Sequence, residues 1–495
     1  MKKLLTLTVI TASLFSSTAF SVDFNDTENI LERSKAHTNI EYNIMVQRAT
    51  QAAIHYMPAV TQIDFLKATR RAGGDYNTVM YINKPFGSEK GFLTANDTTA
   101  YAWSTITTRE GVLIVEVPPA SEKVDYFGSF VDAWEVPLVD VGYNGADKGK
   151  GGKYAFLPVN YDDSEGTKAQ LEKKGYIVVE STTSDIGFAF RPTLSNKATH
   201  KDAGDYAQRI KIYPLAEGKS QTHFIDATDL NYDCLPYYNM TFFEDINDVV
   251  QNNPIRLQDK AIASLLKDVG IEKGKEFSPN SEQIKAIKEG TELAYAHLQN
   301  KFTKRGETVA TLWNDPKTKE RLSEWSFWNF GSQANKGFTF DEPNEIMVDK
   351  RAATYFYVTY LPKNLGGSTF YLTGLRDSDG EMLNGEDTYV LNVPADTPAK
   401  DFWSAIVYNM ETKNFNRNVD RVGASTKDMP NMVKNSDGSV DIYFGPNMDN
   451  VPTDKQANFV TTKGEDFFLL FRLYRPTSKT FFKDWMLGDL DNLTK

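Results

Sequence analysis

The chain has 495 residues and a formal net charge of −11, from 66 acidic and 55 basic side chains. Because nucleic acids and anionic membranes attract positive surfaces, this charge argues against either as the main partner. Hydrophobic residues make up 40% and charged residues 24%, as in soluble globular proteins, and the length predicts two or three domains. With only five His and one Cys, we expect no metal site.

The first residues have the layout of a secretory signal peptide. A basic start precedes an apolar stretch over residues 4–15, which is too short to span a bilayer, and small residues then lead to Ser21. We therefore predict a signal peptide over residues 1–21 and a periplasmic or secreted mature protein without an integral membrane segment. A buried N-terminal helix is the alternative interpretation of this stretch.

The next part of the chain, residues 22–75, is predicted to be helical. Apolar residues recur at helical spacing between Ile40 and Ile54. Proline removes a backbone donor and clashes with the preceding turn, so we expect Pro58 to end this helix.

Residues 76–240 are predicted to form the smaller of two β-sandwiches. Short apolar runs, such as 111–118 and 126–131, are separated by turns, which is typical of strands. The glycine-rich loop over 145–153 lacks the spacing of a phosphate-binding loop, so we interpret it as a hairpin loop.

Residues 241–330 are predicted to be a helical insertion, and residues 331–495 the larger, jelly-roll-like sandwich. Within the latter, the run from Phe467 to Tyr474 is apolar on both faces except at Arg472, which is typical of a central strand. The predicted fold class is therefore mainly β. It comprises two antiparallel β-sandwich (jelly-roll-like) domains with a helical insertion between them and an N-terminal helical segment.

Motifs spread along both halves resemble a pair of domains found together in secreted bacterial proteins. In the first half they are Asn96-Asp97-Thr98-Thr99-Ala100-Tyr101, Asp132-Ala133-Trp134 and Arg191-Pro192-Thr193. In the second half they are Leu383-Asn384-Gly385, Phe402-Trp403-Ser404, Arg421 and Arg472-Leu473-Tyr474-Arg475-Pro476. The first set resembles the domain of unknown function 1254, and the second resembles the domain of unknown function 1214. The resemblance implies the same two sandwiches with a helical insertion, and it supplies no reaction and no catalytic residue.

Two functions stay open, because the sequence contains no recognised motif for a nucleophile, a metal or a dinucleotide. The first is a periplasmic binding or interaction protein for a small polar or carbohydrate-like ligand, without a cofactor, which aromatic-rich sandwiches would suit. The second is a hydrolase that uses a pair of carboxylates on a glycan or an ester. The pair Trp325 and Trp328 offers either a platform for a sugar ring or core filling. Formation of a homo-oligomer is also left open.

Four residues make up the candidate ligand site: Asp132, Trp134, Arg191 and Arg421. Asp132 and Trp134 have the same parity on a strand-like segment, so both can point to one face. An aromatic plane beside a carboxylate can hold a polar ring or a cation. Arg191 and Arg421 could each pair with a carboxylate or an anionic ligand. The alternative is that all four are internal, with Trp134 in the core and each Arg bonded to a buried acid or a loop carbonyl.

Overall fold

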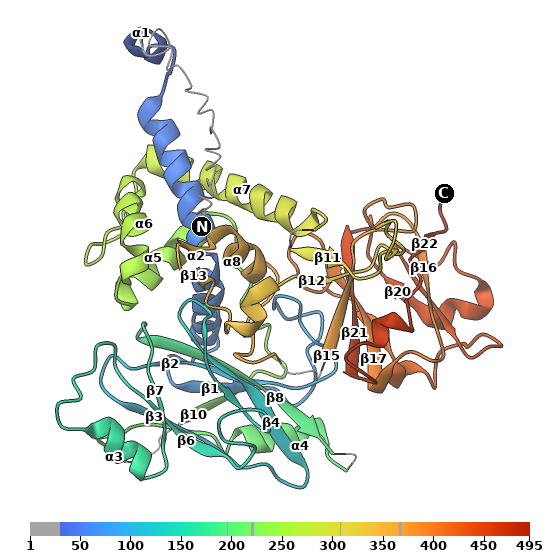
Figure 1. Cartoon of the computed structure of the whole chain (residues 1–495), viewed down its shortest axis with the longest axis horizontal. Helices are drawn as coiled ribbons and strands as arrows, with labels where there is room; N and C mark the ends of the chain where they lie inside the picture. The colour runs from blue at the N-terminus through green and yellow to red at the C-terminus, as the bar shows by residue number, and fades with distance from the viewer. Residues whose placement is uncertain (1–29, 196, 219–221, 307, 366–368) are drawn as a thin grey trace, which may run out of the picture.

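The computed structural model describes residues 30–195, 197–218, 222–306, 308–365 and 369–495, so the predicted signal peptide lies outside the described residues. Two β-sandwiches, at the bottom and at the right of Figure 1, are joined by a layer of helices. The prediction of a mainly β fold with helical segments is confirmed. Within the described ranges, no helix is both long enough and apolar enough to cross a membrane.

The N-terminal sandwich consists of a six-stranded sheet in the order β10-β1-β2-β8-β4-β5 and a four-stranded sheet in the order β7-β6-β3-β9. Its strands are β1 (Thr78–Tyr81), β2 (Ala102–Thr107), β3 (Leu113–Val117), β4 (Val124–Asp132), β5 (Pro137–Val141), β6 (Gly152–Phe156), β7 (Ile177–Val179), β8 (Asp185–Leu194), β9 (Lys211–Pro214) and β10 (His223–Asp226). Two short helices, α3 (Thr167–Lys173) and α4 (His200–Ala207), lie between strands along the chain. In the buried core of this sandwich, Phe130 of the large sheet packs against Phe156 of the small sheet and against Phe188 of its own sheet.

The C-terminal sandwich repeats this plan, with a six-stranded sheet in the order β11-β12-β15-β21-β17-β18 and a four-stranded sheet in the order β20-β19-β16-β22. Its strands are β11 (Val309–Thr311), β12 (Ser326–Trp328), β15 (Thr369–Gly374), β16 (Tyr389–Val393), β17 (Ala399–Asn409), β18 (Gly423–Ser425), β19 (Val440–Gly445), β20 (Phe459–Thr461), β21 (Phe467–Pro476) and β22 (Asp491–Asn492). A separate hairpin is formed by β13 (Asp341–Glu342) and β14 (Glu345–Ile346). Strand β21 is central, as its two-sided apolar pattern predicts. The strands β11 and β12 lie within 241–330, so the chain joins the C-terminal sheet before that range ends.

The helical layer is built around α2 (Ile40–Arg71), which contacts α5, α6, α7 and α8. The other helices are α1 (Ile30–Ser34), α5 (Met240–Asn252), α6 (Lys260–Leu265), α7 (Ser281–Thr303) and α8 (Val348–Tyr355). Short 3-10 turns lie at η2 (Leu257–Asp259), η3 (Leu266–Val269), η4 (Gly331–Asn335), η5 (Thr426–Asp428), η6 (Thr453–Asn458) and η7 (Phe481–Lys483). At the closest approach of α2 and α7, Gly290 leaves no room for a side chain, because a Cβ there would lie 2.5 Å from the Cβ of Ala49.

The prediction that Pro58 ends the first helix is wrong, because α2 continues through Pro58 to Arg71. Almost every residue from Ala49 to Thr69 is buried, so the packing of several elements around α2 offsets the loss of one backbone hydrogen bond. The usual cost of proline is given for exposed helix interiors, whereas α2 is surrounded by protein from Ala49 to Thr69.

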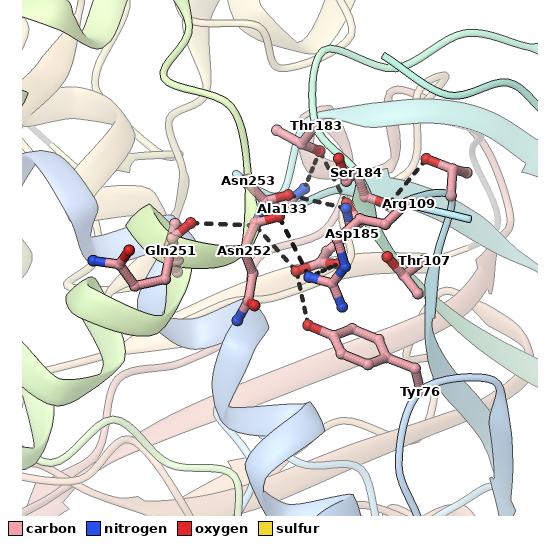
Figure 2. A network of polar contacts seen from close by, with 12 residues as sticks. Tyr76, Thr107, Arg109, Ala133, Thr183, Ser184, Asp185, Gln251, Asn252 and Asn253 are labelled. Carbon is pink, nitrogen blue, oxygen red and sulfur yellow. Dashed lines mark hydrogen bonds and ion pairs between the residues drawn. The ribbon is translucent and has the colours of Figure 1, made fainter. Parts of the chain in front are cut away.

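A polar network centred on the buried side chains of Asp185 and Asn253 joins the N-terminal sandwich to the helical layer (Figure 2). Asp185 begins β8, and its Oδ2 accepts hydrogen bonds from the Tyr76 hydroxyl at 3.0 Å and from Asn253 Nδ2 at 3.0 Å. The Asp185 backbone N–H donates to Asn253 Oδ1 at 2.9 Å, and Arg109 Nη1 lies 3.4 Å from Asp185 Oδ1. Because these groups are bonded to one another across the joint, they fix the end of α5 against β8.

Candidate functional site

A cavity of about 790 Å³ lies between the two sandwiches and is lined by residues from both. Its walls come from β2, β4, β5 and β8 on one side and from β12, β15 and β21 on the other, with the connecting segment 358–365 between them. We call this cavity the interdomain pocket. It lies on the face of each large sheet that is turned away from the sheet's own sandwich core.

The N-terminal wall follows the two-residue period of β4 and β8. Alternate residues of these strands line the pocket: Asp125, Phe127, Ser129, Ala189, Arg191 and Thr193. The residues between them fill the sandwich core: Tyr126, Phe130, Phe188 and Phe190. Arg191 is directly opposite Phe127 in the strand register, so both side chains project from the same face of the sheet.

The C-terminal wall is built by the same alternation. Tyr371 of β15 is directly opposite Arg472 of β21, and both line the pocket. The neighbouring residues Leu372 and Phe471 belong to the core of the C-terminal sandwich. The ring of Trp328 stacks on that of Tyr371, with centroids 4.9 Å apart and an angle of 11° between the planes.

Further aromatic rings form an apolar lining between these walls. Phe86 stacks on Phe92 with centroids 4.1 Å apart and on Tyr101 with centroids 4.8 Å apart. Trp103 meets Phe92 edge-on at 5.7 Å. The guanidinium carbon of Arg191 lies 5.2 Å from the centroid of the Tyr101 ring, which places its positive charge over an aromatic face.

Two guanidinium groups give the pocket its positive charge. Arg191 is half-buried, whereas Arg472 is 2% exposed and donates from Nη2 to the carbonyl oxygen of Thr94 at 3.1 Å. Among the described residues, no carboxylate lies within ion-pair distance of either group. The Nε and Nη1 atoms of Arg472 are buried without a described hydrogen-bond partner. The positive charge of this site is therefore not neutralised by a direct ion pair.

Tyr371 lies beside both arginines, and their charges change the pKa of its hydroxyl. Burial opposes ionisation of its hydroxyl, but Arg191 and Arg472 outweigh burial and hold the pKa of Tyr371 below its usual value. Asp97 is an acidic group close enough to interact with Arg472 through space. Burial raises the pKa of Asp97 to about 6, although Arg472 opposes the shift. The site is therefore most positive below about pH 6, where Asp97 holds a proton.

The four residues proposed from sequence do not come together in this pocket. Arg191 alone among them lines it. Arg421 donates from Nε to Gly423 O at 2.9 Å and from Nη1 to Ala457 O at 2.9 Å, so its guanidinium holds loops of the C-terminal sandwich together.

Asp132 and Trp134 lie in a different buried group, which we call the Trp134 cluster: His55, Asp132, Trp134, Arg256, Asp259 and Arg351. The guanidinium carbon of Arg256 lies 4.1 Å from the Trp134 ring centroid, and its Nε donates to Asp259 Oδ2 at 2.5 Å. Asp132 Oδ1 accepts from the Trp134 N–H at 2.8 Å, and its other oxygen lies 3.8 Å from Arg256 Nη1. Asp132 and Trp134 are each 3% exposed, as in the internal alternative for these two residues.

Sequence reasoning missed Tyr371, Arg472 and Trp328 as members of one site. The sequence did mark Arg472, the single charge in a strand that is apolar on both faces. A lone arginine at such a position indicates that one face of the strand meets something other than apolar core. Its partners could not be read from the sequence, because Arg191 lies in the other sandwich.

Comparison with known proteins agrees with the architecture. Residues 76–214 match the family described as "Protein of unknown function (DUF1254)", and residues 368–478 match "Protein of unknown function (DUF1214)". The chain belongs to the proteins that pair these two domains. In this DUF1254–DUF1214 protein, Arg191 lies in the first domain, whereas Tyr371 and Arg472 lie in the second, so the interdomain pocket needs both.

Two solved structures align with most of this DUF1254–DUF1214 protein. The crystal structure of the VPA0106 protein from Vibrio parahaemolyticus has a TM-score of 0.50 at 17% identity, over 90% of this chain and 99% of that chain. An uncharacterized protein from Burkholderia cenocepacia has a TM-score of 0.37 at 10% identity, over 94% of this chain and 99% of that chain. The search of curated proteins finds no match. The Vibrio likeness concerns the fold alone.

Proposed function

We propose that this protein is an exported binding protein whose interdomain pocket takes a small ligand with an anionic group. The observation that supports the proposal is the pair Arg191 and Arg472, which line one pocket without a carboxylate partner among the described residues. A charge removed from water without a counter-charge is costly. An anionic ligand would supply that counter-charge.

The two arginines would have different roles. Arg191 is half-buried on the wall of the pocket, so it is the group expected to contact the anion directly through charge-assisted hydrogen bonds. Arg472 is buried and fixed by the Thr94 carbonyl, so it would act mainly through its positive potential. The Tyr371 hydroxyl, which lies beside both arginines, would donate a further hydrogen bond to the anion.

The carboxylates of the pocket do not support the alternative of a two-carboxylate hydrolase. Asp140 accepts from the Ser129 hydroxyl at 2.9 Å and from the Lys363 backbone N–H at 2.7 Å through Oδ1. Its Oδ2 accepts from the Asn364 backbone N–H at 2.9 Å. Both oxygens thus anchor the connecting segment, and the described lining residues offer Asp125 no second carboxylate that is free of such bonds. Binding without chemistry is the function that the pocket supports best.

Calorimetric titration with 2-naphthoate and with its neutral amide, 2-naphthamide, tests the proposal. We expect the acid to bind more tightly than the amide. Arg191→Met should weaken binding of the acid by about 1.5–3 kcal/mol, or roughly 10- to 150-fold, which is typical of a hydrogen bond to a charged group. Binding of the amide should change little.

Arg209→Met is the matched control. Arg209 also lies over a tyrosine, with its guanidinium carbon 5.0 Å from the Tyr206 ring centroid, but it is exposed and does not line the pocket. This variant should bind 2-naphthoate like the unmodified protein. If the amide binds as tightly as the acid, or if Arg191→Met leaves the affinity for the acid unchanged, the proposal is wrong.

A further inference from the structure

We infer that the ligand of the interdomain pocket is amphipathic, with a carboxylate head at Arg191 and an aliphatic or aryl-alkyl body along the aromatic lining. This inference rests on the proposed function, because it places the anionic head where that function requires it. It adds the chemical class of the rest of the ligand, and it disfavours a carbohydrate.

The size of the pocket is the first argument. A volume of about 790 Å³ lies within the range of about 300–1,000 Å³ that is usual for pockets that bind drug-sized molecules. A bare anion at the guanidinium groups would leave most of this space without contacts. The ligand therefore needs a body that fills the pocket beyond its charged end.

The chemistry of the lining is the second argument. Aromatic residues make up 13 of the 37 residues that line the pocket, whereas only four are charged, so the body meets apolar faces over most of its surface. The Arg191 guanidinium lies over the ring of Tyr101, and Tyr101 continues through Phe86 into a stack that ends at Phe92. A ligand whose apolar part is attached to its carboxylate would cover these rings while the head meets Arg191.

The polar groups of the lining give the third argument, because several are already used within the protein. The Thr94 hydroxyl donates to Tyr357 O at 2.8 Å, and the Ser129 hydroxyl donates to Asp140 at 2.9 Å. The Asn364 side chain also donates to Asp140, at 3.0 Å. A sugar needs a partner for each of its hydroxyl groups, whereas an alkyl or aryl body needs none.

Exposed apolar side chains at the edge of the pocket are the fourth argument. Three lining residues are large, apolar or aromatic, and exposed: Phe127 at 42%, Tyr143 at 77% and Leu365 at 48%. Phe127 is opposite Arg191 in the strand register, so this apolar edge begins next to the charged group. A body longer than the interior can continue along these side chains, which extends the surface it removes from water.

Titration with straight-chain carboxylates from butanoate to decanoate, kept below micellar concentrations, tests the inference. Each buried methylene should lower the dissociation constant roughly fourfold, the fold-change that corresponds to about 0.8 kcal/mol, until the chain leaves the pocket. Glucuronate serves as the carbohydrate acid and should bind more weakly than octanoate. Octylammonium carries the same chain with the opposite charge and should not bind at this site.

Tyr143→Ser tests the exposed edge, with Leu257→Ser as its control. Both residues are exposed, at 77% and 83%, so neither substitution is expected to disturb folding, and Leu257 does not line the pocket. Tyr143→Ser should weaken the binding of decanoate several-fold and leave the affinity for butanoate unchanged. Leu257→Ser should alter neither affinity.

The outcomes separate the two proposals. If carboxylates bind in an Arg191-dependent way but with an affinity that does not increase with chain length, or if glucuronate binds more tightly than octanoate, the amphipathic ligand is refuted and the anion-binding function stands. If neither 2-naphthoate nor any chain carboxylate binds, or if octylammonium binds as well as octanoate, the anion-binding function itself fails.

Discussion

Arg256 supplies positive charge to the Trp134 cluster, and replacing it with Met is expected to destabilise the fold without weakening ligand binding. Its side chain is 6% exposed, and the side chains of its two acidic neighbours, Asp259 and Asp132, are 2% and 4% exposed. Met keeps much of the packing volume against Trp134 but removes the charge. Of the side-chain hydrogen bonds that Asp259 makes to described residues, the 2.9 Å contact between its Oδ1 and His55 Nε2 would then remain.

The expected loss is about 3–5 kcal/mol of unfolding free energy at pH 7, the usual cost of removing one partner from a buried ion pair. The pKa of Asp259 is lowered in the intact cluster, where hydrogen bonds from His55 and Arg256 together outweigh burial. Such a group stabilises the fold above its unfolded pKa, and this contribution is lost as pH falls through the folded pKa. Without Arg256 the pKa of Asp259 should rise, so the difference between variant and parent should shrink from pH 7 to pH 5.

Urea unfolding, followed by circular dichroism and tryptophan fluorescence, measures this loss in the first cooperative transition. Adding Asp259→Asn to Arg256→Met should recover at least about 1 kcal/mol, because a buried amide costs less than an unpaired carboxylate. Arg475→Met removes an arginine that pairs with Asp401 at the surface and should cost at most about 1 kcal/mol. A loss below about 1 kcal/mol for Arg256→Met at pH 7, with no recovery in the double variant, would refute this account of the cluster.

Three further outcomes are expected. The affinity for 2-naphthoate should fall between pH 5 and pH 7.5 as Asp97, with a pKa of about 6, becomes negative near the site, and calorimetry on Asp97→Asn should show no such fall. Gly290→Ala should cost about 1–3 kcal/mol in urea unfolding, whereas Gly488→Ala, where a Cβ would meet nothing within 4 Å, should cost almost nothing. Burial lowers the pKa of Lys413 from 10.5 to about 7. Because the unfolded chain binds this proton more tightly, the free energy of unfolding should increase from pH 7 to pH 9. In Lys413→Met that gain should be absent when the same unfolding measurement is made at both pH values.

The strand patterns predicted the sandwiches because the alternation of residues within a strand is a local feature of the sequence. In β4 and β8, alternate apolar residues such as Phe130 and Phe188 fill the sandwich core, and this alternation can be read without a structure. The helix α2 was harder to delimit, because the effect of Pro58 depends on how completely its surroundings bury it. Local rules thus predicted the fold class but not where α2 ends.

The candidate site was predicted only in part, for a related reason. Arg191 could be selected from the Arg191-Pro192-Thr193 motif, but its partners Tyr371 and Arg472 lie in the other sandwich. Asp132 and Trp134 do lie near each other, through the turn after β4 rather than along a strand, since β4 ends at Asp132. Which charged residues face a ligand and which balance one another inside the protein is decided by tertiary packing.

The two large sheets share a feature that connects fold and function. Each has one face in its own sandwich core and a second face that meets the helical layer and the interdomain pocket. In β21 the second face carries Phe468 and Leu470, which pack in the core shared with the helices, and then Arg472 where the pocket begins. In β8 the second face likewise changes from an apolar residue, Ala189, which contacts that core, to a charged one, Arg191, which lines the pocket. The helices therefore cover the apolar part of both second faces. The two arginines lie just beyond the part that the helices cover, which is why the positive charge lies between the sandwiches.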